Sequence, residues 1–110
     1  MAEVQKDTVG NREDTVRFLD LVSMFSTQGM IALGKLVNPT TGKAEKNLGA
    51  ARIFIDLLEM LERKTSGNLT ADESRVLRSA LTDLRLMFVE ESKVAEDARE
   101  KDKPASEEKK

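Results

Sequence analysis

The chain has 110 residues, a formal net charge of −2, 39% hydrophobic residues and 35% charged residues. It contains no Cys, His, Tyr or Trp, which excludes disulfides, thiolate metal sites, cysteine nucleophiles and the commonest general base. A single core of this size is only marginally stable, and oligomerisation is a usual remedy. Because nothing requires an oxidising compartment and the start lacks the apolar segment of a signal peptide, we expect a cytoplasmic protein.

The beginning of the chain is polar and shows no periodicity, so we expect residues 1–14 to form a disordered arm. The body, residues 15–92, carries ten basic and ten acidic residues and is therefore neutral. Nucleic-acid-binding domains usually carry a clear basic excess, so no nucleic-acid partner is expected.

The first predicted helix covers residues 15–37, where apolar residues recur at spacings of three, four and seven. Asn38-Pro39 ends it, because proline cannot continue the helical hydrogen-bond ladder. Residues 18–37 have the length of a membrane span, but Asp20, Gln28 and Lys35 within them disfavour one, so we expect a buried amphipathic helix. Gly29 lies in the middle of its apolar face. It indicates either a close helix crossing at a dimer axis or a packing glycine inside the monomer.

The second predicted helix, residues 47–65 with Asn47 as N-cap, is the most informative element. At 100° per residue, its charged residues Arg52, Asp56, Glu59 and Arg63 fall in one stripe that is roughly 60° wide. Apolar residues cover roughly 200° of the rest, whereas an ordinary surface helix has an apolar stripe of about 100° or a little more. The helix must therefore be covered from more than one side, which predicts a homodimer in the form of a six-helix bundle.

The third predicted helix covers residues 71–91 and begins at a capping box, with Thr70 as N-cap and Glu73 three residues later. Leucines and a phenylalanine at helical spacing form its apolar face. Residues 93–110 are predicted to form a charged helical extension, which Pro104 ends, and then a disordered tail.

Three arginines of the third helix, Arg75, Arg78 and Arg85, lie on one flank beside the apolar face. They indicate either a site for a carboxylate or phosphate of a partner or a solvated face paired with acidic residues of the second helix. For the second case we hypothesise an ion pair between Asp56 and Arg85.

No pattern identifies a catalytic, cofactor-binding or metal-binding residue. Helical di-iron sites need histidines that the chain lacks, and residues 37–44 fail the phosphate-loop pattern at two positions. The candidate interaction residues are therefore Gly29, Asp56, Arg75, Arg78 and Arg85.

Several short phrases of the body also match a known family. They are Leu33-Gly34, Pro39-x-Thr41-Gly42, Asn47-Leu48, Ala51-Arg52, Ile55-Asp56, Met60-Leu61, Lys64-Thr65, Gly67-Asn68-Leu69-Thr70 and Asp83-Leu84-Arg85. On these residues the chain resembles the bacterial domain-of-unknown-function family 1844, and the resemblance covers residues 18–89. The resemblance implies a short, all-helical, cytoplasmic bacterial protein for which no catalytic residues are established.

The expected fold is all-α, a three-helix antiparallel bundle that dimerises into a larger helical bundle. The expected function is that of a non-catalytic interaction or scaffold protein, a homodimer with an unidentified protein partner. One alternative is a small helical enzyme or ligand-binding protein that uses Asp, Glu and Arg in a pocket between helices. Another alternative is a peripheral membrane or nucleic-acid adaptor.

Overall fold

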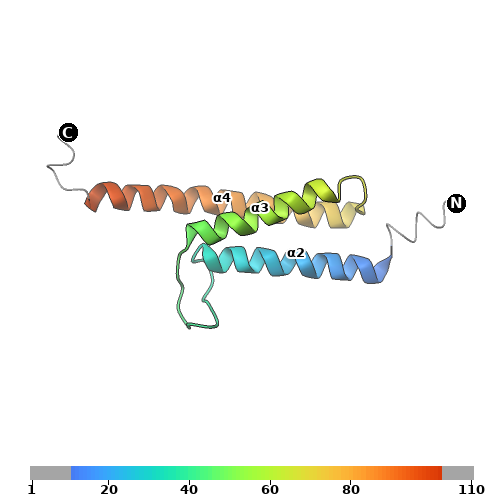
Figure 1. The fold of residues 1–110 in the computed structure, drawn as a ribbon, viewed down its shortest axis with the longest axis horizontal. Coiled ribbons are helices and arrows are strands. Elements are labelled where there is room, and N and C mark those ends of the chain that lie inside the picture. Colours follow the sequence, from blue (N-terminus) through green and yellow to red (C-terminus); the bar gives the residue numbers. More distant parts are fainter. Residues whose placement is uncertain (1–10, 103–110) are drawn as a thin grey trace.

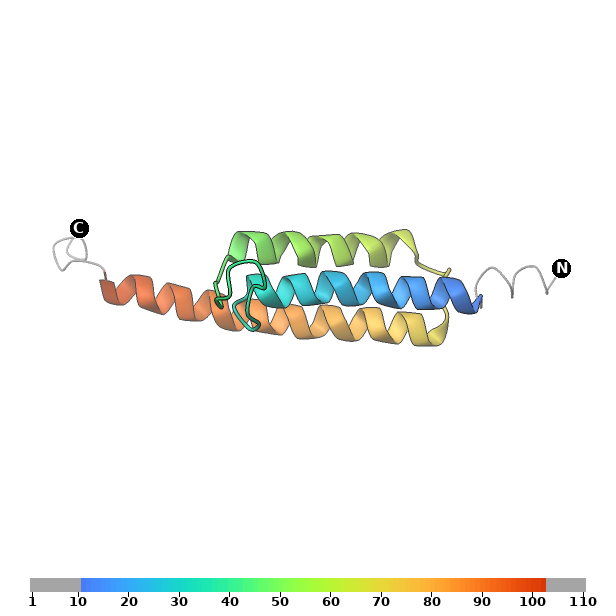
Figure 2. The ribbon, with the colours of Figure 1, turned by 90° about the horizontal axis from the view of Figure 1, so that it is seen from below.

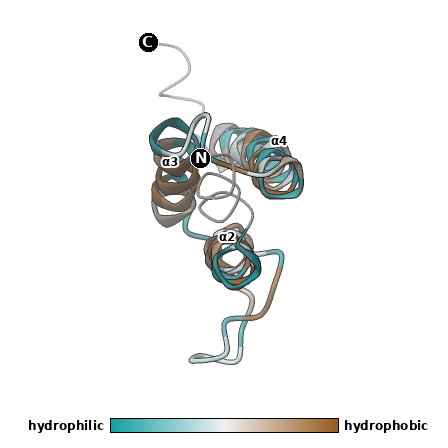
Figure 3. Cartoon of the chain, turned by 90° about the vertical axis from the view of Figure 1, so that its right-hand side faces the viewer, coloured by the Kyte–Doolittle hydropathy of each residue, from teal (hydrophilic) through white to brown (hydrophobic). Residues whose placement is uncertain are grey.

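The computed structural model describes residues 11–102, and these residues form three helices (Figure 1). They are α2 (Arg12–Ala32), α3 (Leu48–Lys64) and α4 (Ala71–Asp102). α2 and α3 run antiparallel, as do α3 and α4, and every pair of helices is in contact. Seen end-on, the helices stand at the corners of a triangle (Figure 3). The prediction of an all-α bundle is therefore confirmed.

The core is built from small and aliphatic side chains of all three helices and of Leu33, the residue that follows α2. Its nine buried hydrophobic residues are Val22, Ala32, Leu33, Ala51, Ile55, Leu58, Leu77, Leu81 and Leu84. A Cβ atom on Gly29 would lie 3.1 Å from Cδ2 of Leu84 and 3.7 Å from Cβ of Phe54. Gly29 is buried at this crossing, where the missing side chain lets the other helices approach α2 closely.

α2 begins earlier than the sequence predicted. The side-chain oxygen of Asn11 accepts a hydrogen bond from the amide of Asp14 at 2.9 Å and caps the helix. Residues 12–14, which we expected in the disordered arm, are therefore helical, while residues 1–10 lie outside the described residues. Thr15, the predicted first residue, lies in the first turn of the helix.

α2 also ends earlier than predicted, at Ala32 rather than residue 37. Gly34 adopts a φ of +79°. The amide of Gly34 donates to the carbonyl of Ile31 at 3.0 Å, and the amide of Lys35 donates to the carbonyl of Met30 at 2.9 Å. These two bonds form a Schellman motif, which ends the helix although the apolar spacing continues beyond it.

The connector between α2 and α3, residues 33–47, projects from one end of the bundle (Figures 1 and 2). Antiparallel bridges join Leu33 to Lys46 and Asn38 to Lys43, so the connector resembles a narrow hairpin. At its tip the carbonyl of Asn38 accepts a hydrogen bond from the amide of Gly42 at 2.7 Å. The predicted Asn38-Pro39 turn is therefore present, but it lies several residues beyond the end of the helix.

α3 and α4 begin at caps that the sequence predicted. The side chain of Asn47 accepts a hydrogen bond from the amide of Ala50 at 3.0 Å. The hydroxyl of Thr70 accepts one from the amide of Glu73 at 3.1 Å, and the Glu73 carboxylate accepts one from the Thr70 amide at 2.8 Å. Both caps are confirmed. α4 then continues to Asp102, so its last turns project beyond the beginning of α3 (Figure 2).

Candidate interaction surface

α3 is apolar on two opposite faces. One face, with Ala51, Ile55 and Leu58, has no exposed surface and packs into the core. The opposite face carries Ile53, Leu57 and Met60, which we call the outer stripe. Spacings of four and three residues place the three side chains in one line along the helix.

The outer stripe is not covered by the chain's own helices. Ile53 is 59% exposed and Met60 is 36% exposed, while Leu57 is half-buried. Apolar colouring is accordingly extensive on α3 in the end-on view (Figure 3). The chain therefore covers one apolar side of this helix and leaves a second side open.

Three charged residues of α3, Arg52, Asp56 and Glu59, lie on the flank that faces α4. Arg52 pairs with Asp56 one turn later at 3.1 Å, and its guanidinium lies 5.8 Å from the ring centroid of Phe88 in α4. Glu59 pairs with Arg85 of α4, at 3.0 Å from both Nη2 and Nε. These contacts join α3 to α4 along one edge of the outer stripe.

The hypothesised ion pair between Asp56 and Arg85 is wrong. Arg85 pairs with Glu59 instead, and Asp56 is held by Arg52 of its own helix. Residue 59 lies about 60° closer to α4 than residue 56 because each helical residue rotates the chain by about 100°. The two helices are linked by an ion pair, but its acidic residue is Glu59.

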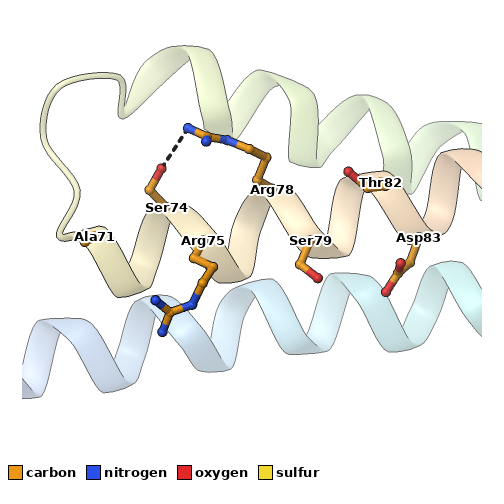
Figure 4. Close-up of a pocket in the computed structure, with 7 residues that line it drawn as sticks. All are labelled: Ala71, Ser74, Arg75, Arg78, Ser79, Thr82 and Asp83. Atoms are coloured by element: carbon orange, nitrogen blue, oxygen red, sulfur yellow. Dashed lines mark hydrogen bonds between the residues drawn. The ribbon is translucent and has the colours of Figure 1, made fainter.

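The arginines of α4 do not converge on one point. The Arg75 side chain points toward α2, whereas that of Arg78 points toward α3 (Figure 4). Arg75 Nη2 lies 2.6 Å from Oδ1 of Asp72 in its own helix, and Arg78 donates to the Ser74 hydroxyl at 3.2 Å. The depression between them has a volume of about 540 Å³ and is lined by Ala71, Ser74, Arg75, Arg78, Ser79, Thr82 and Asp83. It presents two guanidiniums that point apart, rather than a shared anion site.

Gly29, the remaining candidate, lies inside the three-helix core and away from the surface. Of its two interpretations, the structure shows packing within the chain. The five sequence candidates therefore divide into one core position and four charged surface residues. The structure brings none of them together with another: Asp56 and Arg85 have separate partners, and Arg75 and Arg78 point apart.

Two glutamates of α4 that were not candidates hold the ends of the bundle. Glu73 is only 4% exposed, and its second oxygen accepts a hydrogen bond from the Thr15 hydroxyl of α2 at 2.6 Å. We call Glu73, Thr15 and Thr70 the clasp. The capping box predicted the Thr70 contact, but no local pattern pointed to Thr15, which lies in another helix.

At the other end, Glu91 forms ion pairs with Lys35 at 2.7 Å and Lys46 at 2.6 Å. We call these three residues the latch, because the two lysines flank the hairpin of the connector. The hydrogen bond from Lys35, followed by that from Lys46, lowers the pKa of Glu91 to about 2. The hydrogen bond to Glu91 also raises the pKa of Lys35. No sequence signal links these residues, because they are far apart along the chain.

Among residues 11–102, no group of three or more acidic side chains is placed to hold a metal ion. No helix in this part of the chain is both long and apolar enough to cross a bilayer.

The family model described as "Domain of unknown function (DUF1844)" matches residues 15–90. The match covers the three-helix body and stops before the projecting turns of α4. Neither a curated protein nor a solved structure matches the chain.

Proposed function

Because the chain belongs to the DUF1844 family, a domain of unknown function, we propose a role from its surface: it is a non-catalytic helical interaction protein that acts as a homodimer. The observation that carries the proposal is the outer stripe of α3, where Ile53 is 59% exposed on a helix whose other face is already buried. The closed symmetry of most homo-oligomers uses one self-complementary patch twice. An apolar stripe meets this requirement, since it is complementary to itself.

The size of the stripe sets the expected strength of the dimer. Full burial of an Ile, Leu or Met side chain contributes about 1.5–3 kcal/mol, and these three side chains are already partly covered. Because of this partial cover, roughly half of that free energy is still available on dimerisation. The six side chains of the two copies would therefore contribute on the order of 5–9 kcal/mol, against an association cost of about 4–15 kcal/mol. We therefore expect a concentration-dependent dimer of moderate affinity, rather than one that never dissociates.

Sedimentation equilibrium over a wide range of protein concentration tests the homodimer. We expect a monomer–dimer equilibrium for the natural chain and at least a tenfold weaker dimer for Ile53→Asp. Leu86→Asp is the matched control, because Leu86 of α4 is also 59% exposed but lies outside the outer stripe. It should leave the equilibrium unchanged, and circular dichroism should show that both variants keep their helices. A natural chain that stays monomeric at every concentration would contradict the proposal, as would equal effects of the two substitutions.

The interaction role extends beyond the homodimer to a protein partner. The outer surface of α4 supports it, since Leu86 is 59% and Val89 is 61% exposed outside the outer stripe. The test is recovery of a tagged chain from its host at native expression, followed by mass spectrometry. A salt-resistant partner that is lost with Leu86→Asp supports an adaptor role, and recovery of the chain alone counts against it.

A further inference from the structure

We propose that two copies of the chain pair through α3 in antiparallel orientation, and that Lys64 of each copy forms an ion pair with Glu45 of the other. This inference rests on the proposed homodimer and specifies how the two copies meet. It follows from the residue pattern of the outer face and from the charges at its two ends.

The outer face of α3 carries a heptad pattern that is longer than the outer stripe. Ala50, Leu57 and Lys64 are seven residues apart, as are Ile53 and Met60, and the two series alternate at spacings of three and four. These are the a and d positions of a coiled coil, with Ala50, Leu57 and Lys64 at a and Ile53 and Met60 at d. Such a seam packs against another helix of the same kind.

A parallel pair of seams would place identical residues opposite each other. Lys64 would then face the partner's Lys64 inside the seam, so two ammonium groups would lie close together. Ala50 would face the partner's Ala50 and leave a gap. Like charges in direct opposition are unfavourable, and so is an unfilled layer.

An antiparallel pair removes both faults, because a positions then lie opposite d positions. Ala50 meets the partner's Met60, so a small side chain faces a long one, and Ile53 meets the partner's Leu57. The two-fold axis repeats both contacts, which gives four apolar layers. Along the helix axis, Lys64 then lies opposite position 46 of the partner, which precedes the first residue of α3 and is adjacent to Glu45.

Glu45 lies close to the first position of the seam. It lines a depression of about 210 Å³ between α2 and α3, together with Ala50 and Phe54 of α3 and with residues of α2 such as Gln28 and Ile31, and Ala50 is the first a position. Both Glu45 and Lys64 are exposed, and neither belongs to an ion pair among the described residues. The neighbouring Lys46 is held by Glu91, so Glu45 supplies the negative charge at this end.

Charge reversal tests the ion pair in the full chain by sedimentation equilibrium at low salt. We expect Lys64→Glu and Glu45→Lys each to weaken the dimer roughly three- to tenfold, and the double variant to restore it. The control combines Glu45→Lys with Lys93→Glu on α4, which keeps the same net charge and should not restore the dimer. If the natural chain forms a dimer but the double variant Lys64→Glu/Glu45→Lys does not regain its affinity, this inference is overturned, while the proposed homodimer is not.

Cross-linking tests the orientation, and the assay is clean because the chain has no cysteine of its own. Under mild oxidation, a mixture of Ala50→Cys and Met60→Cys chains should form the mixed disulfide. Met60→Cys alone should not, because antiparallel pairing separates the two Met60 positions by about 15 Å along the helix axes. Efficient cross-linking of Met60→Cys to itself, without the mixed product, would show parallel pairing and overturn the inference.

Discussion

The two ends of the bundle are each held by a glutamate of α4, but the two carboxylates have different kinds of partner. Glu73 is 4% exposed and accepts hydrogen bonds from uncharged groups, the hydroxyl of Thr15 and the amide of Thr70. The Glu91 side chain is 14% exposed and faces the ammonium groups of Lys35 and Lys46. A buried acceptor resists salt, whereas ion pairs near the surface are screened by it. We therefore expect the contribution of the clasp to be independent of salt concentration and that of the latch to decrease as salt is added.

The largest effect is expected at the clasp. Glu73→Ala removes half of the capping box and leaves the Thr15 hydroxyl without its acceptor. Loss of a cap costs about 1 kcal/mol. A buried polar group without a partner costs about 1–3 kcal/mol, and the lower part of this range applies to Thr15, which is half-buried. We expect the free energy of unfolding to fall by about 2–3 kcal/mol, measured by urea denaturation at one fixed protein concentration.

Glu91→Ala is the control for this experiment, because it shortens a glutamate of the same helix at the other end. Its effect should be smaller than that of Glu73→Ala and should decrease further in 0.5 M salt, where the Debye length is roughly 4 Å. Equal losses from the two substitutions would mean that the two ends do not differ in the way described.

A loss of stability of intermediate size is expected when the backbone is strained at the latch end of the bundle. Gly34→Ala places a Cβ on a residue with a φ of +79°, and this left-handed conformation costs about 1–2 kcal/mol for an L-residue. The new methyl group would lie 3.6 Å from Cβ of Lys46, an ordinary contact, so backbone strain causes the loss. Thermal unfolding should detect it.

Gly49→Ala is the matched control, because Gly49 lies in the first turn of α3 and is not among the positive-φ glycines. Alanine is the better helix former by up to about 1 kcal/mol, so this variant should be as stable as the natural chain or more stable. If both variants lost stability to the same extent, the left-handed conformation of Gly34 would not be the cause.

The smallest effect is expected from Glu91→Gln at neutral pH, which keeps the shape of the side chain and removes its charge. Because the latch lowers the pKa of Glu91 from 4.5 to about 2, its contribution is fully present above about pH 4.5. That contribution is lost as the pH falls toward 2. The difference between the natural chain and the variant, measured as the unfolding midpoint, should therefore shrink across this range.

The contribution of Lys35 to stability depends on pH in the opposite direction. The raised pKa of Lys35 means that its contribution is present below its ordinary value of 10.5 and is lost as the pH rises beyond it. A difference between the natural chain and Glu91→Gln that stayed constant from pH 7 to pH 2 would contradict the assignment of the latch.

Features that depend on neighbours along the chain could be predicted from the sequence. The caps at Asn47 and Thr70 were identified because their partners lie three residues away. The three helices followed from apolar spacing, and the second apolar side of α3 followed from the width of its arc. The end of α2 was missed because the apolar spacing continues through Leu36, whereas the glycine at position 34 ends the helix.

Features that depend on how one helix is rotated against another could not be predicted. Glu59 and Asp56 are both acidic residues of α3 near its α4 flank, and only the packed structure shows that Arg85 selects Glu59. The partners of Thr15 and Lys46 lie in α4, far along the sequence. For Gly29 the sequence allowed a role between copies or inside one copy, and the position of Leu84 assigned it to the core.

The hairpin form of the connector gives the protein a position that tolerates added sequence. The bridge between Leu33 and Lys46 fixes the base of the connector, and the latch ties this base to α4. The tip, residues 39–42, is exposed and is enclosed by the second bridge, between Asn38 and Lys43. An insertion there lengthens a loop whose ends are already closed, and loop entropy grows only slowly with length. An epitope or a small reporter could therefore be grafted at the tip without changing the spacing of the helices.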